Sequence, residues 1–284
     1  MKKIHFDVAP DGFYGAYWPC PRETDCTIIA MLGDDPEDYM TRSAVKWLLK
    51  QNVNALTMSP GKKCYDHHNY PLERIETAMN CLKAHGSRKI GIAGASTTGT
   101  LALTAASYFP DLTLTIAMTA SDFIWQGFMQ GDKDGCKEWP IEGESLFTYR
   151  GEPLPYMPFC YQHPQYWRVF DAETKRTGNM LNSRKIFDDS EAAHPIREEE
   201  FIKVENIRGK LLLVAAGTPL FSADAPAVAG TVIRRNRGPG EARGAGKELP
   251  LPCLPRALAR CAGFLRCTEF LQCGGLSRRY PLAP

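Results

Sequence analysis

The chain has 284 residues, 44% of them hydrophobic, which is enough apolar material for one large single-core domain and excludes a chain disordered throughout. Its formal net charge of +2 gives no general attraction for nucleic acid or an anionic membrane, so the expected partner is a small molecule. No apolar run approaches the roughly 18 residues of a membrane span, and no signal peptide follows the N-terminal lysines. We therefore expect a cytoplasmic protein without a membrane span and with reduced cysteines.

Strands alternate with helices along most of the chain. Short runs rich in β-branched and aromatic residues predict the strands, and apolar residues three and four apart predict the helices. In chain order we expect strands at 13–18 and 26–32, a helix from Tyr39, a strand at 53–58, a helix from Pro71 to about Gly86, a strand at 89–95, a helix at 101–109, and strands at 112–118 and 207–216. This alternation predicts an α/β fold, with a mostly parallel sheet and helices on both faces.

Residues 121–190 interrupt the alternation. Between Trp139 and Phe170 there are seven aromatic residues interleaved with five prolines, without regular periodicity. A connecting segment of this length generally has a function or covers a site. We interpret it as an aromatic-rich cap inserted over the active site; the alternative is an insertion that only packs against the domain.

Residues 89–99 carry the most informative motif, a strand that runs directly into a helix through small residues. A nucleophilic serine in such a place sits on a sharp turn at the carboxyl end of the strand, and its neighbours must be small. Ser96 follows Gly94 by two residues, but Thr98 stands where the second glycine of G-x-S-x-G would be, and the glycine comes one later. We predict that Ser96 is a nucleophile; the alternative is a serine that only caps the following helix.

Five pieces of the chain follow one another in an order that can be compared with known enzymes: Met31-Leu32-Gly33, Trp47-Leu48-Leu49, residues 69–73, residues 94–99 and residues 202–213. From Gly33 to Ala216 this order resembles the C-terminal catalytic domain of the acyl-CoA thioesterase and bile-acid-CoA:amino-acid N-acyltransferase family. The resemblance implies an α/β-hydrolase fold. It also implies an enzyme that cleaves acyl-CoA thioesters, or passes the acyl group to an amino acid, through an acyl-enzyme on Ser or Cys. A serine at position 96 favours hydrolysis.

The roles of the neighbouring residues follow from this chemistry. Attack by Ser96 on a thioester or ester carbonyl creates an oxyanion, which needs preorganised hydrogen-bond donors. The backbone N–H of Thr97 is the expected first donor, and a backbone N–H at Gly33 or Asp34 the second, unless Gly33 is only a turn glycine. The sequence indicates no cofactor and no metal, because residues 66–68 lack a further ligand at metal spacing.

An acid and a histidine should follow the serine in the chain. In the family that the chain resembles, the acid lies just beyond the strand at 207–216, where this chain has Gly217-Thr218-Pro219. Asp224 is the only acid near this place; the alternative is that it is a turn residue. No histidine follows the last predicted strand; the six are His5, His67, His68, His85, His163 and His194. The sequence therefore identifies no base, and a non-catalytic acyl-binding protein and an acyl-CoA:amine N-acyltransferase remain as alternatives.

The composition changes after residue 217. Residues 218–284 contain one Lys, nine Arg, eight Pro and four of the ten Cys, whereas the preceding residues contain 14 Lys and 10 Arg. Glycine and proline between residues 236 and 255 exclude a central strand or helix there. We predict a hydrolase domain at 1–217 and an atypical tail at 218–284 that is a non-native reading, such as translation in a shifted frame. The alternative is a natural, disordered Arg/Pro-rich tail.

Overall fold

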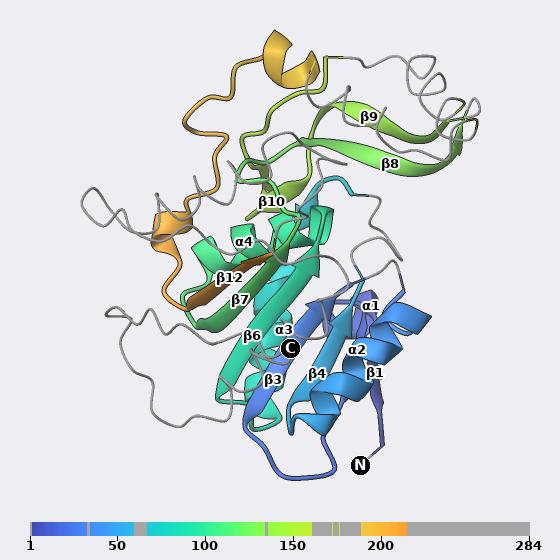
Figure 1. Cartoon of the computed structure of the whole chain (residues 1–284), viewed down its shortest axis with the longest axis vertical. Coiled ribbons are helices and arrows are strands. Elements are labelled where there is room, and N and C mark those ends of the chain that lie inside the picture. The colour runs from blue at the N-terminus through green and yellow to red at the C-terminus, as the bar shows by residue number, and fades with distance from the viewer. Residues whose placement is uncertain are drawn as a thin grey trace, which may run out of the picture.

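A computed structural model describes residues 2–32, 35–59, 67–133, 136–160, 172, 176 and 189–214. Its main sheet has seven strands in the order β1-β2-β4-β3-β6-β7-β12 (Figure 1). The five strands from β4 to β12 in this order run parallel, whereas β2 is antiparallel to both β1 and β4. The strands are β1 (Ile4–Phe6), β2 (Gly15–Trp18), β3 (Cys26–Met31), β4 (Asn54–Met58), β6 (Lys89–Ala95), β7 (Leu112–Met118) and β12 (Lys210–Val214).

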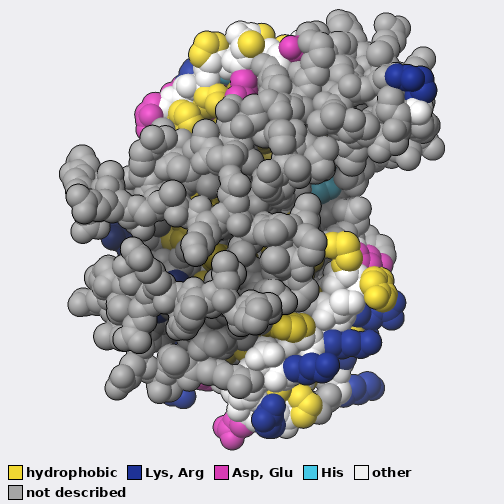
Figure 2. All heavy atoms as spheres, in the orientation of Figure 1, with side chains coloured by type: hydrophobic (Ala, Val, Ile, Leu, Met, Phe, Trp, Pro, Cys, Tyr) yellow, Lys and Arg dark blue, Asp and Glu magenta, His cyan; other side chains and the backbone are white. Residues whose placement is uncertain are grey.

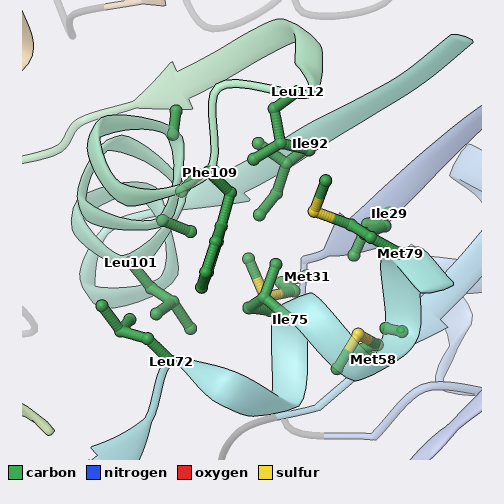
Figure 3. Packing of buried hydrophobic residues seen from close by; sticks show 14 of the residues in the cluster. Ile29, Met31, Met58, Leu72, Ile75, Met79, Ile92, Leu101, Phe109 and Leu112 are labelled. Atoms are coloured by element: carbon green, nitrogen blue, oxygen red, sulfur yellow. The ribbon is translucent and has the colours of Figure 1, made fainter. Parts of the chain in front are cut away.

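Helices cover both faces of this sheet. The side chains of β3 alternate between the faces, because successive residues of a strand point to opposite sides. Ile29 and Met31 join a core with helices α3 (Glu73–Ala84) and α4 (Thr97–Tyr108), which Figure 3 shows from close by. Ile28 and Ala30 pack with α2 (Tyr39–Lys50) on the other face. The shorter helices are α1 (Val8–Asp11) and η1 (Val204–Asn206).

Helix α2 shows how the sequence sets one of these elements. Its N-cap residue, Asp38, accepts a hydrogen bond from the backbone N–H of Thr41 at 2.6 Å, which satisfies one of the donors left open at a helix start. Val45 and Leu48 are buried against the sheet. The opposite face is exposed and basic, with Arg42, Lys46 and Lys50 four residues apart, and dark blue side chains gather there in Figure 2. The helix is therefore amphipathic.

Strands also occur within the insertion at 121–190, although its sequence has no regular periodicity from which to predict them. β8 (Gln126–Lys133) and β9 (Cys136–Ser145) form a two-stranded antiparallel sheet, and β10 (Phe147–Tyr149) pairs with β11 (Glu152–Pro153) and with β5 (Tyr70–Pro71). In Figure 1 the β8–β9 hairpin stands beyond one end of the main sheet. Its register shifts twice, so side chains do not alternate cleanly along the two strands.

The strands predicted at 89–95 and 112–118 are confirmed with those limits. Two details of the prediction were wrong. β1 was missed, because three residues are too few to show a periodicity. Pro71 lies in β5, and α3 begins only at Glu73. α4 begins at Thr97, so the strand runs directly into a helix as the motif predicted.

The predicted tail at 218–284, with Asp224, lies outside the described residues, as does Gly33. The division at residue 217 and the covering role of the insertion thus stay predictions. Within the described ranges, no helix is long and apolar enough to cross a membrane.

Candidate active site

Ser96 occupies the turn between β6 and α4 in a conformation that few non-glycine residues adopt. Its φ is 55° and its ψ is −124°. Holding a side chain in such a region costs on the order of 1–3 kcal/mol, and this kind of strain is concentrated at active sites. The side chain of Ser96 is exposed. The turn therefore presents the hydroxyl to solvent at the carboxyl end of a central parallel strand.

The structure excludes the alternative that Ser96 serves as a helix cap. Ser96 occupies the N-cap position of α4, but its side chain makes no capping hydrogen bond. Other side chains accept from the backbone amides of the turn: Ala95 N–H donates to the Thr98 hydroxyl at 2.9 Å, and Ser96 N–H lies 3.3 Å from the Thr119 hydroxyl oxygen. A strained serine whose hydroxyl stabilises nothing local is what a nucleophile requires and a cap does not.

Backbone contacts on both sides hold Ser96 in place. Its N–H donates to the carbonyl oxygen of Met118 at 2.8 Å, and lies 3.3 Å from the hydroxyl oxygen of Thr119. Its carbonyl oxygen accepts from the N–H of Thr100 at 3.0 Å. The contact with Met118 connects the turn to the end of β7, and the contact with Thr100 belongs to the first turn of α4. These contacts offset the cost of the unfavourable backbone conformation.

Two glycines make the turn possible through close backbone approach. A Cβ at Gly94 would lie 2.0 Å from the carbonyl oxygen of Thr98. A Cβ at Gly99 would lie 2.8 Å from the carbonyl oxygen of Met118. Both distances are shorter than van der Waals contact allows. Gly94 is thus the small residue that the motif requires before the serine, whereas Gly99 makes room for β7.

Thr98 fills the position of the usual glycine and is buried. Its hydroxyl oxygen accepts a hydrogen bond from the N–H of Ala95 at 2.9 Å and donates to the carbonyl oxygen of Met31 at 2.6 Å. The carbonyl oxygen of Ala95 also lies 2.9 Å away, but the single hydroxyl hydrogen favours the shorter contact to Met31. In the sequence, Thr98 was only a departure from the G-x-S-x-G pattern. Its hydrogen bond was not predicted because the partner, Met31 in β3, lies 67 residues away in the chain.

The predicted oxyanion donors are placed in part. Thr97 is the first residue of α4, so its N–H belongs to the helix N-terminus, where backbone donors and the helix dipole favour negative charge. Gly33 lies outside the described residues, but β3 ends at Met31, which pairs with Gly94 in the ladder between β3 and β6. The chain that leads to Gly33 therefore leaves the sheet directly beside the turn that carries Ser96.

None of the five described histidines is hydrogen-bonded to Ser96. His67 stacks on Phe128 with ring centroids 5.0 Å apart, and His68 forms an ion pair with Glu144. The remaining three are engaged as follows: His5 with Glu37, His85 with the carbonyl oxygen of Cys81, and His194 with Glu200. His163 and Asp224 lie outside the described residues. In the part of the chain that the structure describes, no histidine is therefore hydrogen-bonded to Ser96, and the base stays unassigned.

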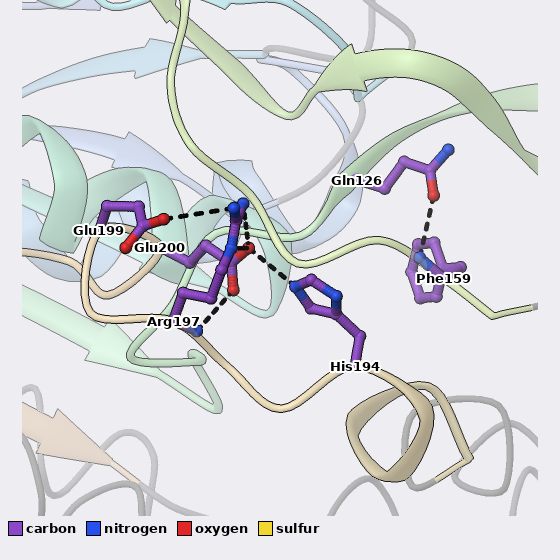
Figure 4. A network of polar contacts seen from close by, with 6 residues as sticks. All are labelled: Gln126, Phe159, His194, Arg197, Glu199 and Glu200. Atoms are coloured by element: carbon purple, nitrogen blue, oxygen red, sulfur yellow. Dashed lines mark hydrogen bonds and ion pairs between the residues drawn. The ribbon is translucent and has the colours of Figure 1, made fainter.

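His194 belongs to a compact ionic cluster, drawn in Figure 4. The carboxylate of Glu200 is fully buried and contacts His194 Nε2 at 2.9 Å, Arg197 N at 2.8 Å and Arg197 Nε at 2.7 Å. Burial alone would raise the pKa of Glu200, but these hydrogen bonds outweigh it and the pKa is lowered. The cluster fixes the segment before β12, which favours a structural role for His194.

The insertion is held together by a buried amide. Gln126 is fully buried and donates from Nε2 to the carbonyl oxygen of Ile141 at 2.7 Å, while its Oε1 accepts from the N–H of Phe159 at 2.9 Å. The ring of Phe159 stacks on Trp125 at 5.2 Å. Two of the aromatic residues that suggested a cap thus have ring contacts outside their own segment, Phe159 with Trp125 and Tyr149 with Tyr108 and Phe109. The described residues contain no cluster of three or more metal-ligating side chains.

Comparison with known proteins gives structural relatives only. No family model matches the chain, and no curated protein matches its sequence. The α/β hydrolase GrgF from Penicillium sp. sh18 matches with a TM-score of 0.51 over 93% of this chain and 97% of its own, at 14% identity. The esterase Pf2001 of Pyrococcus furiosus matches with a TM-score of 0.50 over 93% and 89%, at 15% identity. The chain spans only 43% of another matched structure, that of DcsB with a substrate analogue, where the TM-score is 0.33.

The chain has the α/β-hydrolase fold. In this fold, the nucleophile stands on a strand-to-helix turn, and the second oxyanion donor comes from the loop after the third strand. β6 is the fifth strand of the main sheet in chain order, and β3 is the third. Ser96 therefore lies on the strand-to-helix turn after the fifth strand, beside Met31 at the end of the third.

Proposed function

We propose that this chain is a serine hydrolase that cleaves acyl esters and thioesters, with acyl-CoA as the thioester class, through an acyl intermediate on Ser96. The observation that carries the proposal is the conformation of Ser96: a strained, exposed serine whose hydroxyl makes no local hydrogen bond, at the end of a central strand. Packing requirements alone do not produce such a residue, because an ordinary cap would use its hydroxyl and would have an extended backbone.

The proposed chemistry has two steps. The Ser96 oxygen attacks the acyl carbon, and the resulting oxyanion is stabilised by the N–H of Thr97 and by a backbone N–H of the turn after β3. The serine proton passes to water as the bond to the acyl carbon forms. Collapse of this intermediate expels the thiolate or alkoxide, which takes up a proton from water, and leaves an acyl-Ser96 ester. Water then hydrolyses this ester to the free acid and restores the Ser96 hydroxyl. A base that accepts the serine proton would raise the rate by several orders of magnitude. The turn and the oxyanion donors by themselves support slow acylation.

Two observations support hydrolysis over a purely binding function. GrgF is described as an α/β hydrolase and Pf2001 as an esterase, which favours ester cleavage in general. The acyl-CoA class depends on the resemblance to the thioesterase and N-acyltransferase family and on the presence of serine at position 96.

A fluorophosphonate probe tests the nucleophile directly, because it phosphonylates an activated serine without needing turnover. We expect labelling of the parent protein at Ser96, mapped by peptide mass spectrometry, and none in Ser96→Ala. Ser107→Ala is a matched control: this serine lies on α4, and its hydroxyl donates to the carbonyl oxygen of Thr104 at 2.7 Å. Its loss should leave labelling unchanged.

Substrate class is tested by following product release from p-nitrophenyl esters and from acyl-CoA of several chain lengths. Acylation of Ser96 by an acyl-CoA, seen as one equivalent of released CoA thiol, would support the thioester class. If the parent protein bound acyl-CoA with a rise in melting temperature but was never labelled at Ser96, the proposal would be wrong and a non-catalytic binding protein would replace it.

A further inference from the structure

We infer that Thr98 is a positioning residue for the oxyanion site: its hydroxyl sets the spacing between the nucleophile turn and the end of β3. This inference rests on the proposed function, since it concerns the rate at which Ser96 reacts. The usual hydrolase motif has glycine at this place, which has no side chain to make such a link.

The first step of the argument is the geometry of the link. The ladder between β3 and β6 ends with the pair Met31 and Gly94. One oxygen atom then stands between the strands, because the Thr98 hydroxyl accepts from Ala95 N–H at 2.9 Å and reaches the Met31 carbonyl oxygen at 2.6 Å. The hydroxyl therefore extends the connection of the two strands beyond their last direct pair.

The second step is what each end of the link carries. Ala95 directly precedes Ser96, and Thr98 directly follows Thr97, so one end fixes the nucleophile and the first oxyanion donor. Met31 is the last residue of β3, two residues before Gly33, so the other end fixes the origin of the turn that supplies the second donor. An oxyanion must lie within hydrogen-bond distance of both donors at once, and small displacements of either donor reduce the rate.

The third step is that the link is stiff. Thr98 is buried, and the backbone around it is fixed by Gly94, whose missing side chain lets the Thr98 carbonyl approach closely. A β-branched residue has few side-chain rotamers in a helix, and the hydrogen bonds to Ala95 N–H and to the Met31 carbonyl oxygen fix the direction of this hydroxyl. The link therefore restricts the distance between the turn that carries Ser96 and the end of β3 in the free protein, before any substrate binds.

The inference is tested by comparing Thr98→Val, which keeps the branched shape and removes the hydroxyl, with Thr98→Ser, which keeps the hydroxyl. We expect the maximal rate of fluorophosphonate labelling at Ser96 to fall by about 10- to 100-fold in Thr98→Val, with little change in the probe concentration that gives half the maximal rate. Thr98→Ser should restore most of the rate. If Thr98→Val did not fold, Thr98→Ala and Thr98→Ser would give the same comparison, since they differ only by the oxygen atom.

Thr104→Val controls for a purely structural effect. Thr104 is buried on the same helix and its hydroxyl donates to the carbonyl oxygen of Thr100 at 2.8 Å, so the substitution removes an equivalent buried hydrogen bond far from the turn. It should lower the melting temperature but not the labelling rate.

The outcomes separate this inference from the proposed function. A parent labelled at Ser96, with Thr98→Val reacting at the parental rate, overturns the role of Thr98 and leaves the hydrolase intact. Equal slowing in Thr98→Val and Thr104→Val also overturns it, because general destabilisation would then explain both. A parent that is not labelled at Ser96 overturns both proposals.

Discussion

The strain at Ser96 predicts that glycine at this position makes the folded protein more stable than alanine does. Both substitutions remove an exposed hydroxyl that makes no local hydrogen bond, so the loss of the hydroxyl should change stability by less than about 0.5 kcal/mol. Alanine retains a Cβ at a φ of 55°, whereas glycine has no penalty there. The difference between the two variants therefore reports the backbone strain.

The expected size follows from two opposing terms. Relief of an unfavourable φ and ψ is worth about 1–3 kcal/mol. Glycine also gains about 0.5–1 kcal/mol of conformational entropy in the unfolded chain, which opposes the gain. We therefore expect Ser96→Gly to be about 0.5–2 kcal/mol more stable than Ser96→Ala. Ser96 would then be a residue whose backbone conformation lowers the stability of the fold.

Urea unfolding followed by circular dichroism measures this difference, provided that the dependence on urea concentration is the same in both variants. Ser43 gives a matched control, because it is exposed in the interior of α2 and its hydroxyl bonds to the carbonyl oxygen of Tyr39. There glycine should be less stable than alanine by about 1 kcal/mol. If Ser96→Gly were no more stable than Ser96→Ala while the Ser43 pair behaved as expected, the assignment of strain to Ser96 would be refuted.

Three further predictions concern the turn, the core and the ionic cluster. Gly94→Ala places a Cβ 2.0 Å from the Thr98 carbonyl oxygen, so it should destabilise the protein by about 1–3 kcal/mol in urea unfolding and abolish labelling of Ser96. Ile92→Ala, in the fully buried middle of β6, should cost about 2–5 kcal/mol by the same measurement, whereas Tyr39→Ala, 83% exposed, should cost less than about 0.5 kcal/mol. Glu200→Gln should be less stable than the parent at neutral pH. Because the pKa of Glu200 is lowered in the folded state, the difference in stability should shrink as the pH falls below about 4.5. Melting experiments over a range of pH measure this difference, which should disappear at the lowest pH.

Local patterns determined most of the sheet. The segments 89–95 and 112–118 are continuous runs of small and apolar residues, and strands buried on both faces have this composition. The small residues around Ser96 indicated a strand-to-helix turn, because only Gly, Ala, Ser and Thr fit where the backbone approaches itself so closely. The order of strands and helices was thus sufficient to predict the α/β class and to select Ser96.

Other features depend on contacts between distant parts of the chain, and no local pattern reports them. The insertion forms strands because residues 126–145 pair with each other and β5 pairs with β10, whose partners lie more than 70 residues apart in sequence. The ion pair between His68 and Glu144 has the same origin. In an aromatic-rich insertion, packing between side chains decides which residues are buried, so the buried residues do not recur at a period of 2 or 3.6 residues.

The serine at position 96 and its small neighbours were determined by the sequence, since backbone sterics act over a few residues. Its strained φ, its free hydroxyl and the bridge from Thr98 to Met31 were decided by the tertiary structure. The physical reason is that the sequence shows which hydrogen bonds a side chain is able to make, whereas the partner atom lies on another strand. Only the packed sheet brings the end of β3 to the turn after β6.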